Sequence, residues 1–403
     1  MTVDARSWTL PPARGGFLSG ESTVVYGIAF WLALVQISIA ASQIVLALLV
    51  LLWLYLVARE EASFVSLPFD APFGLYAGLT FGAAAFSFDP GASFPASKEI
   101  LLLVVPYVLV SAVRRLSTLE QLVVVLVGVA DVGALLGLWQ YAFGDLSDIN
   151  HRIRGFLGHY MTYSGLLMGV GILAFAGFLF AEAQSRFRWF LLGSFLLIQA
   201  ALILTLTRSA WIGTAVAVVL LLLVKNWKLL VLVPVMAVGV SALLPRDVER
   251  RVLSLVSPDV SGWDRVYMLR AGSRIVRNHP LLGVGPDMVS EVYPIYVEAD
   301  ARRHDNPHLH NNLVQIAAER GLPALVAWLW FVAAAFYLAM RELRAASGRG
   351  SSRALAAGAL GVLLSGFVAG LFEYNFGDSE FQMLFLFVMS IPLILRRLRA
   401  EAT

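Results

Sequence analysis

The chain has 403 residues, of which 59% are hydrophobic and only 14% are charged. An ordinary soluble domain has about 25% charged residues, and one of this size could not cover so much apolar surface, whereas a lipid bilayer can. The net charge is +3 and there is no cysteine, which excludes disulfides, thiolate nucleophiles and zinc sites built on Cys. We therefore expect an all-α polytopic membrane protein.

Apolar stretches of membrane length recur along the chain and predict about twelve transmembrane helices. They divide the chain into nine helices within residues 1–244, one large charged loop at 245–321, and three helices with a C-terminal tail at 322–403. The predicted spans lie near residues 22–40, 43–58, 70–87, 99–113, 119–141, 160–182, 189–207, 209–224, 228–244, 322–340, 354–372 and 380–395.

The distribution of Lys and Arg predicts the orientation, because positive residues are retained in short cytoplasmic loops. With a cytoplasmic N-terminus, sixteen of these residues fall on the cytoplasmic side and four in short outer connections. We therefore expect both termini to be cytoplasmic and the large loop to be periplasmic.

Two ionisable residues lie within or between apolar stretches. Arg208 separates the runs 202–207 and 209–213, which contain no other charge, and Asp131 lies inside the fifth predicted span. An ionisable residue in such a position is costly and suggests a functional site. The alternative for Arg208 is a turn residue at the outer surface of a helical hairpin, and Asp131 has no obvious partner.

Within the large loop, residues 263–277 are predicted to form an amphipathic helix. Arg270, Arg274 and Arg277 recur at helical spacing and line one face. The stretch has one acidic residue, Asp264, against four arginines, and the guanidinium group matches phosphate oxygens. The segment therefore predicts anion binding, or else a helix face that is solvated or reaches lipid headgroups.

A histidine cluster follows in the same loop, at His304, His308 and His310. Imidazole is suited to general-base catalysis near neutral pH. His308 and His310 would share one face of an extended segment and suggest a metal site. However, no carboxylate pair or further His has recognisable ligand spacing, so we predict no metal and no cofactor.

Three segments resemble the O-antigen ligase and polymerase superfamily of bacterial envelope glycan assembly. They are Thr207-Arg208-Ser209, Asn278 to Pro286 (NHPLLGVGP), and His310 to Leu322 (HNNLVQIAAERGL). In the ligase motif, His is followed by Asn, Ser or Gln, then nine residues, Gly, two residues, and Gly, Thr or Tyr. His310, Asn311 and Gly321 match this pattern, while Ala324 departs from it. Arg265 and Leu269 match an Arg-x3-Leu element of the same loop.

The resemblance implies a membrane architecture of the GT-C glycosyltransferase type, with Arg208, Arg265 and His310 as the essential residues. It also implies a glycan donor on undecaprenyl pyrophosphate, a sugar hydroxyl of lipid A–core as acceptor, and inverting, metal-independent transfer in the bacterial inner membrane. We expect further substrate contacts from Arg270, Arg274, Arg277, His308 and Asn311. Membrane lipids are expected partners and nucleic acid is not.

The chemistry of the residues agrees with this reaction. Preorganised arginines can stabilise the charge that develops on a pyrophosphate leaving group. Neighbouring guanidinium groups would also disfavour an imidazolium ion and keep His310 able to accept a proton. No cysteine nucleophile exists, so direct displacement is simpler than a covalent intermediate.

Two alternatives stay open. A repeat-unit polymerase, or another oligosaccharyltransferase of the same superfamily, would use the same residues with a different acceptor. A secondary transporter would also have about twelve spans, but such proteins tend to show internal repeats and charges at the midplane. No two-half repeat is evident in this sequence, and its charges gather in the outer loop.

Overall fold

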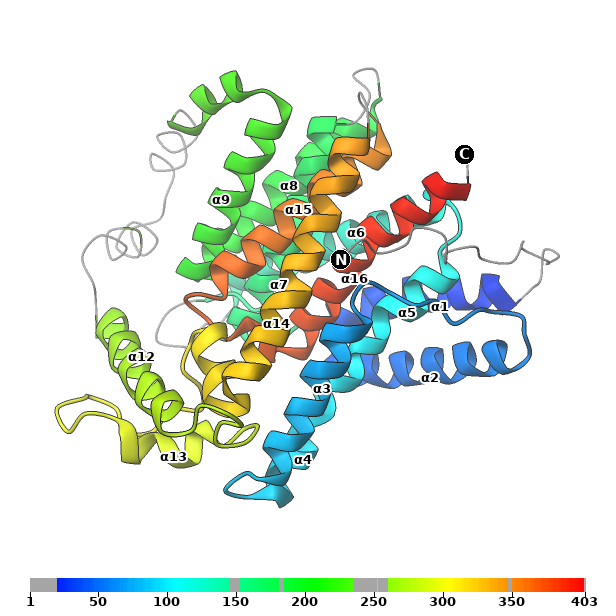
Figure 1. Cartoon of the computed structure of the whole chain (residues 1–403). Coiled ribbons are helices and arrows are strands. Elements are labelled where there is room, and N and C mark those ends of the chain that lie inside the picture. The colour runs from blue at the N-terminus through cyan, green and yellow to red at the C-terminus, as the bar shows by residue number, and fades with distance from the viewer. Residues whose placement is uncertain are drawn as a thin grey trace.

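The computed structural model describes residues 20–144, 152–180, 185–234, 252, 260–346 and 350–401. Within these ranges every regular element is a helix (Figure 1), which confirms the predicted all-α class.

The first half of the chain forms a series of apolar helices. They are α1 (Gly20–Val35), α2 (Ile39–Ala58), α3 (Asp70–Ala85), α4 (Pro90–Ala96), the 3-10 helix η1 (Ser97–Val104), α5 (Val105–Ala112), α6 (Leu116–Phe143), α7 (Tyr160–Phe180), α8 (Phe187–Leu204), α9 (Arg208–Lys225) and the 3-10 helix η2 (Trp227–Val231).

The second half contains the charged loop and the last long helices. Its elements are α12 (Val260–Asn278), α13 (Val289–Tyr296), α14 (Asn312–Ala345), α15 (Ser351–Ala369), the 3-10 helix η3 (Asn375–Gly377) and α16 (Ser379–Glu401).

Nine helical segments within the described residues are long and apolar enough to cross a membrane. They are α2, the continuous segment Pro90–Ala112, α6, α7, α8, α9, α14, α15 and α16. The helices α1 and α3, with 16 residues each, match two further predicted spans but are shorter. Most of the predicted span at 228–244 lies outside the described residues. The chain is therefore a multi-pass membrane protein, and the count of twelve stays a prediction.

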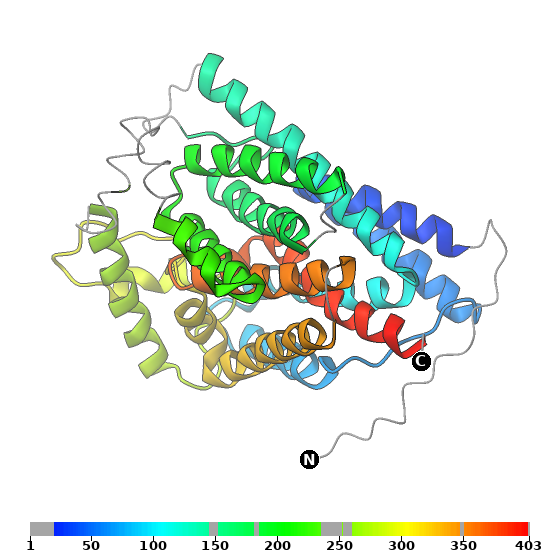
Figure 2. The ribbon, with the colours of Figure 1, turned by 90° about the horizontal axis from the view of Figure 1, so that it is seen from above.

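Helix α15 lies at the centre of the bundle, between α7, α9, α14 and α16 (Figure 2). Small residues allow this close packing, as is common among membrane helices. A Cβ at Gly213 of α9 would lie 2.7 Å from the backbone oxygen of Ser365 in α15, and one at Gly361 would lie 2.8 Å from Ile172 of α7. The two neighbours of α15 therefore approach its backbone closely.

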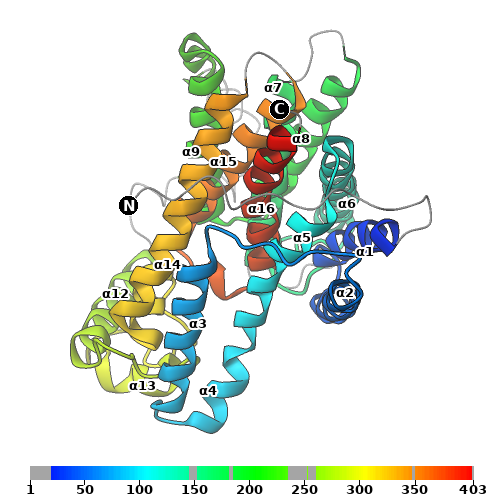
Figure 3. The same ribbon diagram turned by 45° about the vertical axis from the view of Figure 1, so that its right-hand side comes forward.

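The described part of the charged loop, from residue 260 onward, folds into a small helical unit at one end of the bundle, beside α4 and the start of α14 (Figure 3). The predicted amphipathic helix at 263–277 is present as α12. Met268 and Ile275 of α12 pack with Val292 of α13 and with Leu309 in a core separate from that of the bundle. This core fixes α12 against the segment that leads into α14.

The predicted end of the loop at residue 321 is a kink within α14. Gly321 has φ 82° and ψ 168°, so the helix breaks there and continues beyond it, with Pro323 in its next turn. A Cβ on Gly321 would lie 2.0 Å from the carbonyl oxygen of Leu281, and the N–H of Leu322 donates to Pro280. Only glycine suits both the positive φ and this close approach of the 280–282 backbone.

Candidate active site

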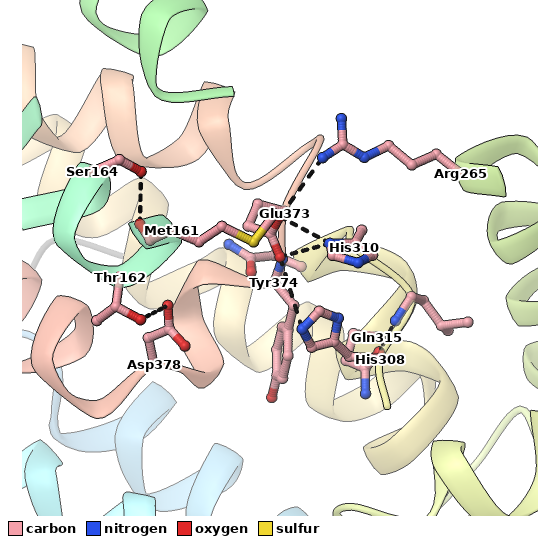
Figure 4. Close-up of polar contacts among 12 residues, drawn as sticks. Met161, Thr162, Ser164, Arg265, His308, His310, Gln315, Glu373, Tyr374 and Asp378 are labelled. Atoms are coloured by element: carbon pink, nitrogen blue, oxygen red, sulfur yellow. Dashed lines mark hydrogen bonds and ion pairs between the residues drawn. The ribbon is translucent and has the colours of Figure 1, made fainter. Parts of the chain in front are cut away.

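The carboxylate of Glu373 is the meeting point of three side chains from distant parts of the chain (Figure 4). Both of its oxygens lie 2.8 Å from Nδ1 of His310. Nη2 of Arg265 lies 3.7 Å from Oε2, and Nε2 of His308 lies 3.9 Å from Oε1. Two of the three predicted essential residues are thus brought together around a carboxylate that the sequence analysis did not single out.

Each member of this group is placed by a different element. Arg265 extends from α12, whereas His308 and His310 lie in the segment that enters α14. Glu373 lies in the connection between α15 and α16. Backbone contacts join the last two segments, since the N–H of Asn312 donates to the carbonyl of Gly370 at 2.7 Å. The site therefore depends on the packing of the loop onto the bundle.

His310 is held in a left-handed backbone conformation with φ 48°. Such a conformation costs a non-glycine residue about 1–3 kcal/mol and persists where the surroundings enforce it. Asn311 enforces it here: its side-chain oxygen accepts the N–H of Val314 at 3.0 Å as the N-cap of α14, and its amide donates to the carbonyl of Leu371 at 2.8 Å. Asn311 thus positions His310, and its predicted substrate contact stays a prediction.

The nearest ionic partner of His310 is Glu373, with the guanidinium group of Arg265 on the far side of that carboxylate, so the charge around His310 comes from a carboxylate as well as from the expected arginine. An ionised carboxylate only accepts hydrogen bonds. In the neutral imidazole, Nδ1 is therefore the protonated nitrogen, and the lone pair is on Nε2. This arrangement orients the ring and leaves one basic nitrogen for a substrate.

The electrostatics keep Glu373 charged. Burial by itself would raise the pKa of Glu373, but the hydrogen bond from His310 outweighs it together with the positive charges of His310, His308 and, least, Arg265, so the pKa lies below 4.5. Burial lowers the pKa of His308 to about 4. At neutral pH the group therefore contains a carboxylate, a guanidinium group and a neutral His308.

A buried ion pair, Arg320 with Glu319, lies next to the group formed by Glu373, His310, His308 and Arg265. Nη1 of Arg320 lies 2.5 Å from Oε2 of Glu319 and 3.4 Å from the hydroxyl of Tyr374, the neighbour of Glu373. Both charged side chains are almost fully buried, and an unpaired charge there would be costly. The pair also receives hydrogen bonds that lead to the His308 segment and to the 283–287 turn: Gln315 and the N–H of Asp287 donate to Glu319, and the N–H of Leu309 donates to Gln315.

Arg208, the third predicted essential residue, is the first residue of α9 and is 7% exposed. Gly213, five residues further along α9, lies against Ser365 and Ala369 near the end of α15. Arg208 is therefore at the same end of the helix pair as Glu373, which follows α15. The contacts that Glu373 makes within the described residues do not include Arg208.

The three arginines on the outer face of α12 have a different environment. Glu298, which follows α13, lies 3.3 Å from Arg270 and 2.6 Å from Arg274. Arg277 is exposed on the same helix. The arginine excess of the sequence stretch is thus partly balanced by a carboxylate from another segment, and the predicted anion contacts of these three residues stay predictions.

His308, His310 and Glu373 also form a candidate metal site, because their ligand atoms all lie within 4.8 Å of one another. The sequence shows no carboxylate at ligand spacing from these histidines, but the fold brings Glu373 next to them. Two ligands of a tetrahedral zinc ion, each bonded at about 2.1 Å, lie roughly 3.4 Å apart. The 2.8 Å separation of Nδ1 from both Glu373 oxygens is shorter than this and fits a direct hydrogen bond.

The position of Glu373 in the sequence is itself an indication of a functional site. Glu373 directly follows the predicted span 354–372 and precedes the span 380–395. An ionisable residue in a short connection between apolar spans is the same feature that identified Arg208. Glu319 and Arg320 gave no such signal, because they resemble ordinary loop residues until the fold buries them.

Part of the chain is similar to a known protein family. The model of a family described as O-antigen ligase matches residues 192–329. The matched region runs from α8 into α14 and contains Arg208, Arg265 and His310, but it ends before Glu373. No curated protein matches the chain.

Proposed function

We propose that the chain is a member of the O-antigen ligase superfamily, whose family model matches residues 192–329, and that it transfers a glycan from undecaprenyl pyrophosphate to a sugar hydroxyl of lipid A–core. The reaction takes place at the periplasmic face of the bacterial inner membrane. The observation that carries the proposal is the contact of His310 with Glu373 beside the guanidinium group of Arg265.

His310 is the general base of the proposed reaction. Its Nε2 takes the proton of the acceptor hydroxyl as the acceptor oxygen attacks the anomeric carbon of the donor. Glu373 accepts the Nδ1 proton and stabilises the imidazolium ion that forms, as the carboxylate does in other base dyads. The bond between the anomeric carbon and the pyrophosphate oxygen breaks in the same step, so the configuration inverts.

Arg208 and Arg265 stabilise the leaving group. The departing pyrophosphate takes the electron pair of the broken bond and gains negative charge, which guanidinium groups can neutralise in a site that excludes water. We call His310 and Glu373 the base dyad. Arg265 lies 3.7 Å from Glu373, so in the proposed reaction its side chain contacts the base dyad and also faces the donor. No metal ion is required for either role.

The experiment is a transfer assay with purified protein, a lipid-linked glycan and lipid A–core. The variant His310→Ala is expected to lose about 10²–10⁴-fold in turnover while donor binding persists. The matched variant His308→Ala, which changes the neighbouring imidazole, is expected to lose far less. Normal turnover by His310→Ala would disprove the proposal.

Chelation separates this mechanism from catalysis by a metal at His308, His310 and Glu373. EDTA is expected to leave the rate unchanged. If EDTA abolishes activity and a divalent ion restores it, the three residues are metal ligands and the base role of His310 is wrong.

A repeat-unit polymerase is the second candidate, since the O-antigen ligase superfamily includes this activity and the same residues would serve. Its acceptor would be another lipid-linked glycan. Supplying both acceptors in one assay distinguishes the two, because a ligase elongates lipid A–core and a polymerase lengthens the lipid-linked chain.

A further inference from the structure

Arg152 is a buried cation that forms no ion pair with any residue the structure describes. It lies in the connection between α6 and α7 and is 8% exposed. Its Nε is buried and has no hydrogen-bond partner within the described residues. The guanidinium carbon lies 4.3 Å from the ring centroid of Tyr160. A cation–π contact stabilises a buried guanidinium group only in part, and a buried charge ordinarily pairs with a carboxylate.

The segment that carries Arg152 is held in a defined shape. The side-chain oxygen of Gln140 accepts the N–H groups of Arg154 and Gly155 at 3.1 Å and 3.0 Å, and its amide donates to the carbonyl of Gly155 at 2.8 Å. Gly155 has φ 57°, and a Cβ there would lie 2.6 Å from the ring of Tyr163. Arg152 is therefore presented by a constrained turn.

This turn adjoins the segment of Arg208. The N–H of Ile153 donates to the carbonyl of Leu204, the last residue of α8, at 3.5 Å. Leu204 is four residues before Arg208. Two buried arginines, Arg152 and Arg208, therefore lie in segments that contact each other at the same end of the bundle.

The same turn also reaches the Glu373 connection through the start of α7. Tyr160, which stacks on Arg152, is the first residue of α7, and the hydroxyl of Thr162 donates to Asp378 at 3.1 Å. Figure 4 shows Met161, between these two residues, extending toward Glu373. The start of α7 therefore contacts both the turn that carries Arg152 and the connection that carries Glu373.

We propose that Arg152 is a third guanidinium group for the donor pyrophosphate, acting with Arg208 and Arg265. The inference rests on the proposed function and names a residue that the O-antigen ligase match, which begins at residue 192, does not include. A pyrophosphate diester carries two negative charges and gains another when the glycan leaves. Three guanidinium groups balance the charge of the leaving group, and the ligand supplies the ionic partner that the described residues do not give Arg152.

The test measures binding of farnesyl pyrophosphate to the purified full-length protein in detergent, with farnesyl monophosphate as the reference probe. Arg152→Gln is expected to weaken pyrophosphate binding at least about tenfold, and Arg152→Lys to weaken it less because the charge remains. Arg154→Gln removes an exposed cation from the same turn and is expected to leave binding within about twofold.

The unfolding temperature without ligand provides a readout that separates ligand binding from support of the fold. Because Arg152→Gln removes a buried charge that has no ion pair among the described residues, the variant is expected to be as stable as the wild type or more stable. A structural arginine would give the reverse, a lower unfolding temperature with unchanged binding, and that result would overturn the inference.

The inference and the proposed function fail in different ways. If Arg208→Gln weakens pyrophosphate binding and Arg152→Gln and Arg152→Lys do not, only the role of Arg152 is wrong. If the wild-type protein binds neither probe and transfers no glycan, the proposed function is wrong and the inference with it.

Discussion

Glu373 and His310 are 63 positions apart in the chain, yet both oxygens of the carboxylate lie 2.8 Å from Nδ1 of the imidazole. Glu373 is 7% exposed and His310 is strained at φ 48°. The hydrogen bonds of Asn311 and the bond between Asn312 and Gly370 hold the two segments in this register. A strained backbone that is fixed from two sides is typical of a preorganised catalytic residue.

The dyad predicts the behaviour of Glu373→Gln. The amide cannot stabilise an imidazolium ion as a carboxylate does, so we expect kcat to fall on the order of 10²–10⁴-fold. Donor binding should change little, because it depends on the arginines. Glu298→Gln is the control, since that carboxylate pairs with Arg270 and Arg274 on the outer face of the loop. Similar losses in both variants would argue against a dyad.

If Arg265 and Arg208 bind the donor with both arms of the guanidinium group, replacing either by lysine should lower activity although the charge is kept. Arg265→Lys and Arg208→Lys keep the positive charge but lose the planar fork that binds two phosphate oxygens. We expect each to lower kcat/KM at least about tenfold. Arg270→Lys, on the same helix as Arg265 but paired with Glu298, serves as the comparison and should retain most activity. Equal rates for Arg265→Lys and the wild type would contradict bidentate binding of the donor.

Asp378 predicts how stability depends on pH. Burial raises the pKa of Asp378 from 3.8 to about 7, so the folded protein binds a proton that the unfolded chain has released between pH 4 and pH 7. The free energy of unfolding therefore falls as the pH rises through this window. Asp378→Asn, which stays neutral, should remove part of this fall in thermal unfolding at pH 5 and pH 8.

The matched control for this measurement is Asp305→Asn, because Asp305 is exposed in the large loop. It should show the wild-type pH dependence. An identical pH dependence in Asp378→Asn and the wild type would mean that Asp378 is ionised in the folded protein.

The orientation in the membrane is tested by single cysteines, which the cysteine-free chain reports without background. Ser273 of α12 and Ser117 of α6 are both exposed. With both termini cytoplasmic, Ser273→Cys should react with an impermeant thiol reagent in spheroplasts. Ser117→Cys should react only after the membrane is permeabilised. The opposite labelling pattern would invert the topology and place the site in the cytoplasm.

The sequence by itself determined the membrane class and most of the helices. Apolar length is a local property, and the bilayer requires backbone hydrogen bonds to be satisfied within each span, so segments such as α6 and α7 followed directly from composition. The amphipathic pattern of 263–277 likewise predicted α12. The unusual placement of Arg208 and the motif that starts at His310 likewise are local features, and they point to these two residues as candidate site residues.

Only the tertiary structure decided the partners of these residues. Glu373 contacts His310, Glu298 pairs with Arg270 and Arg274, and Arg152 is buried on Tyr160. None of these relationships follows from periodicity, because the environment of a side chain depends on segments that are distant in the chain. The carboxylate beside His310 could not be expected from the sequence for this reason. A charge in a sequence has a sign, but its burial and its neighbours exist only in the fold.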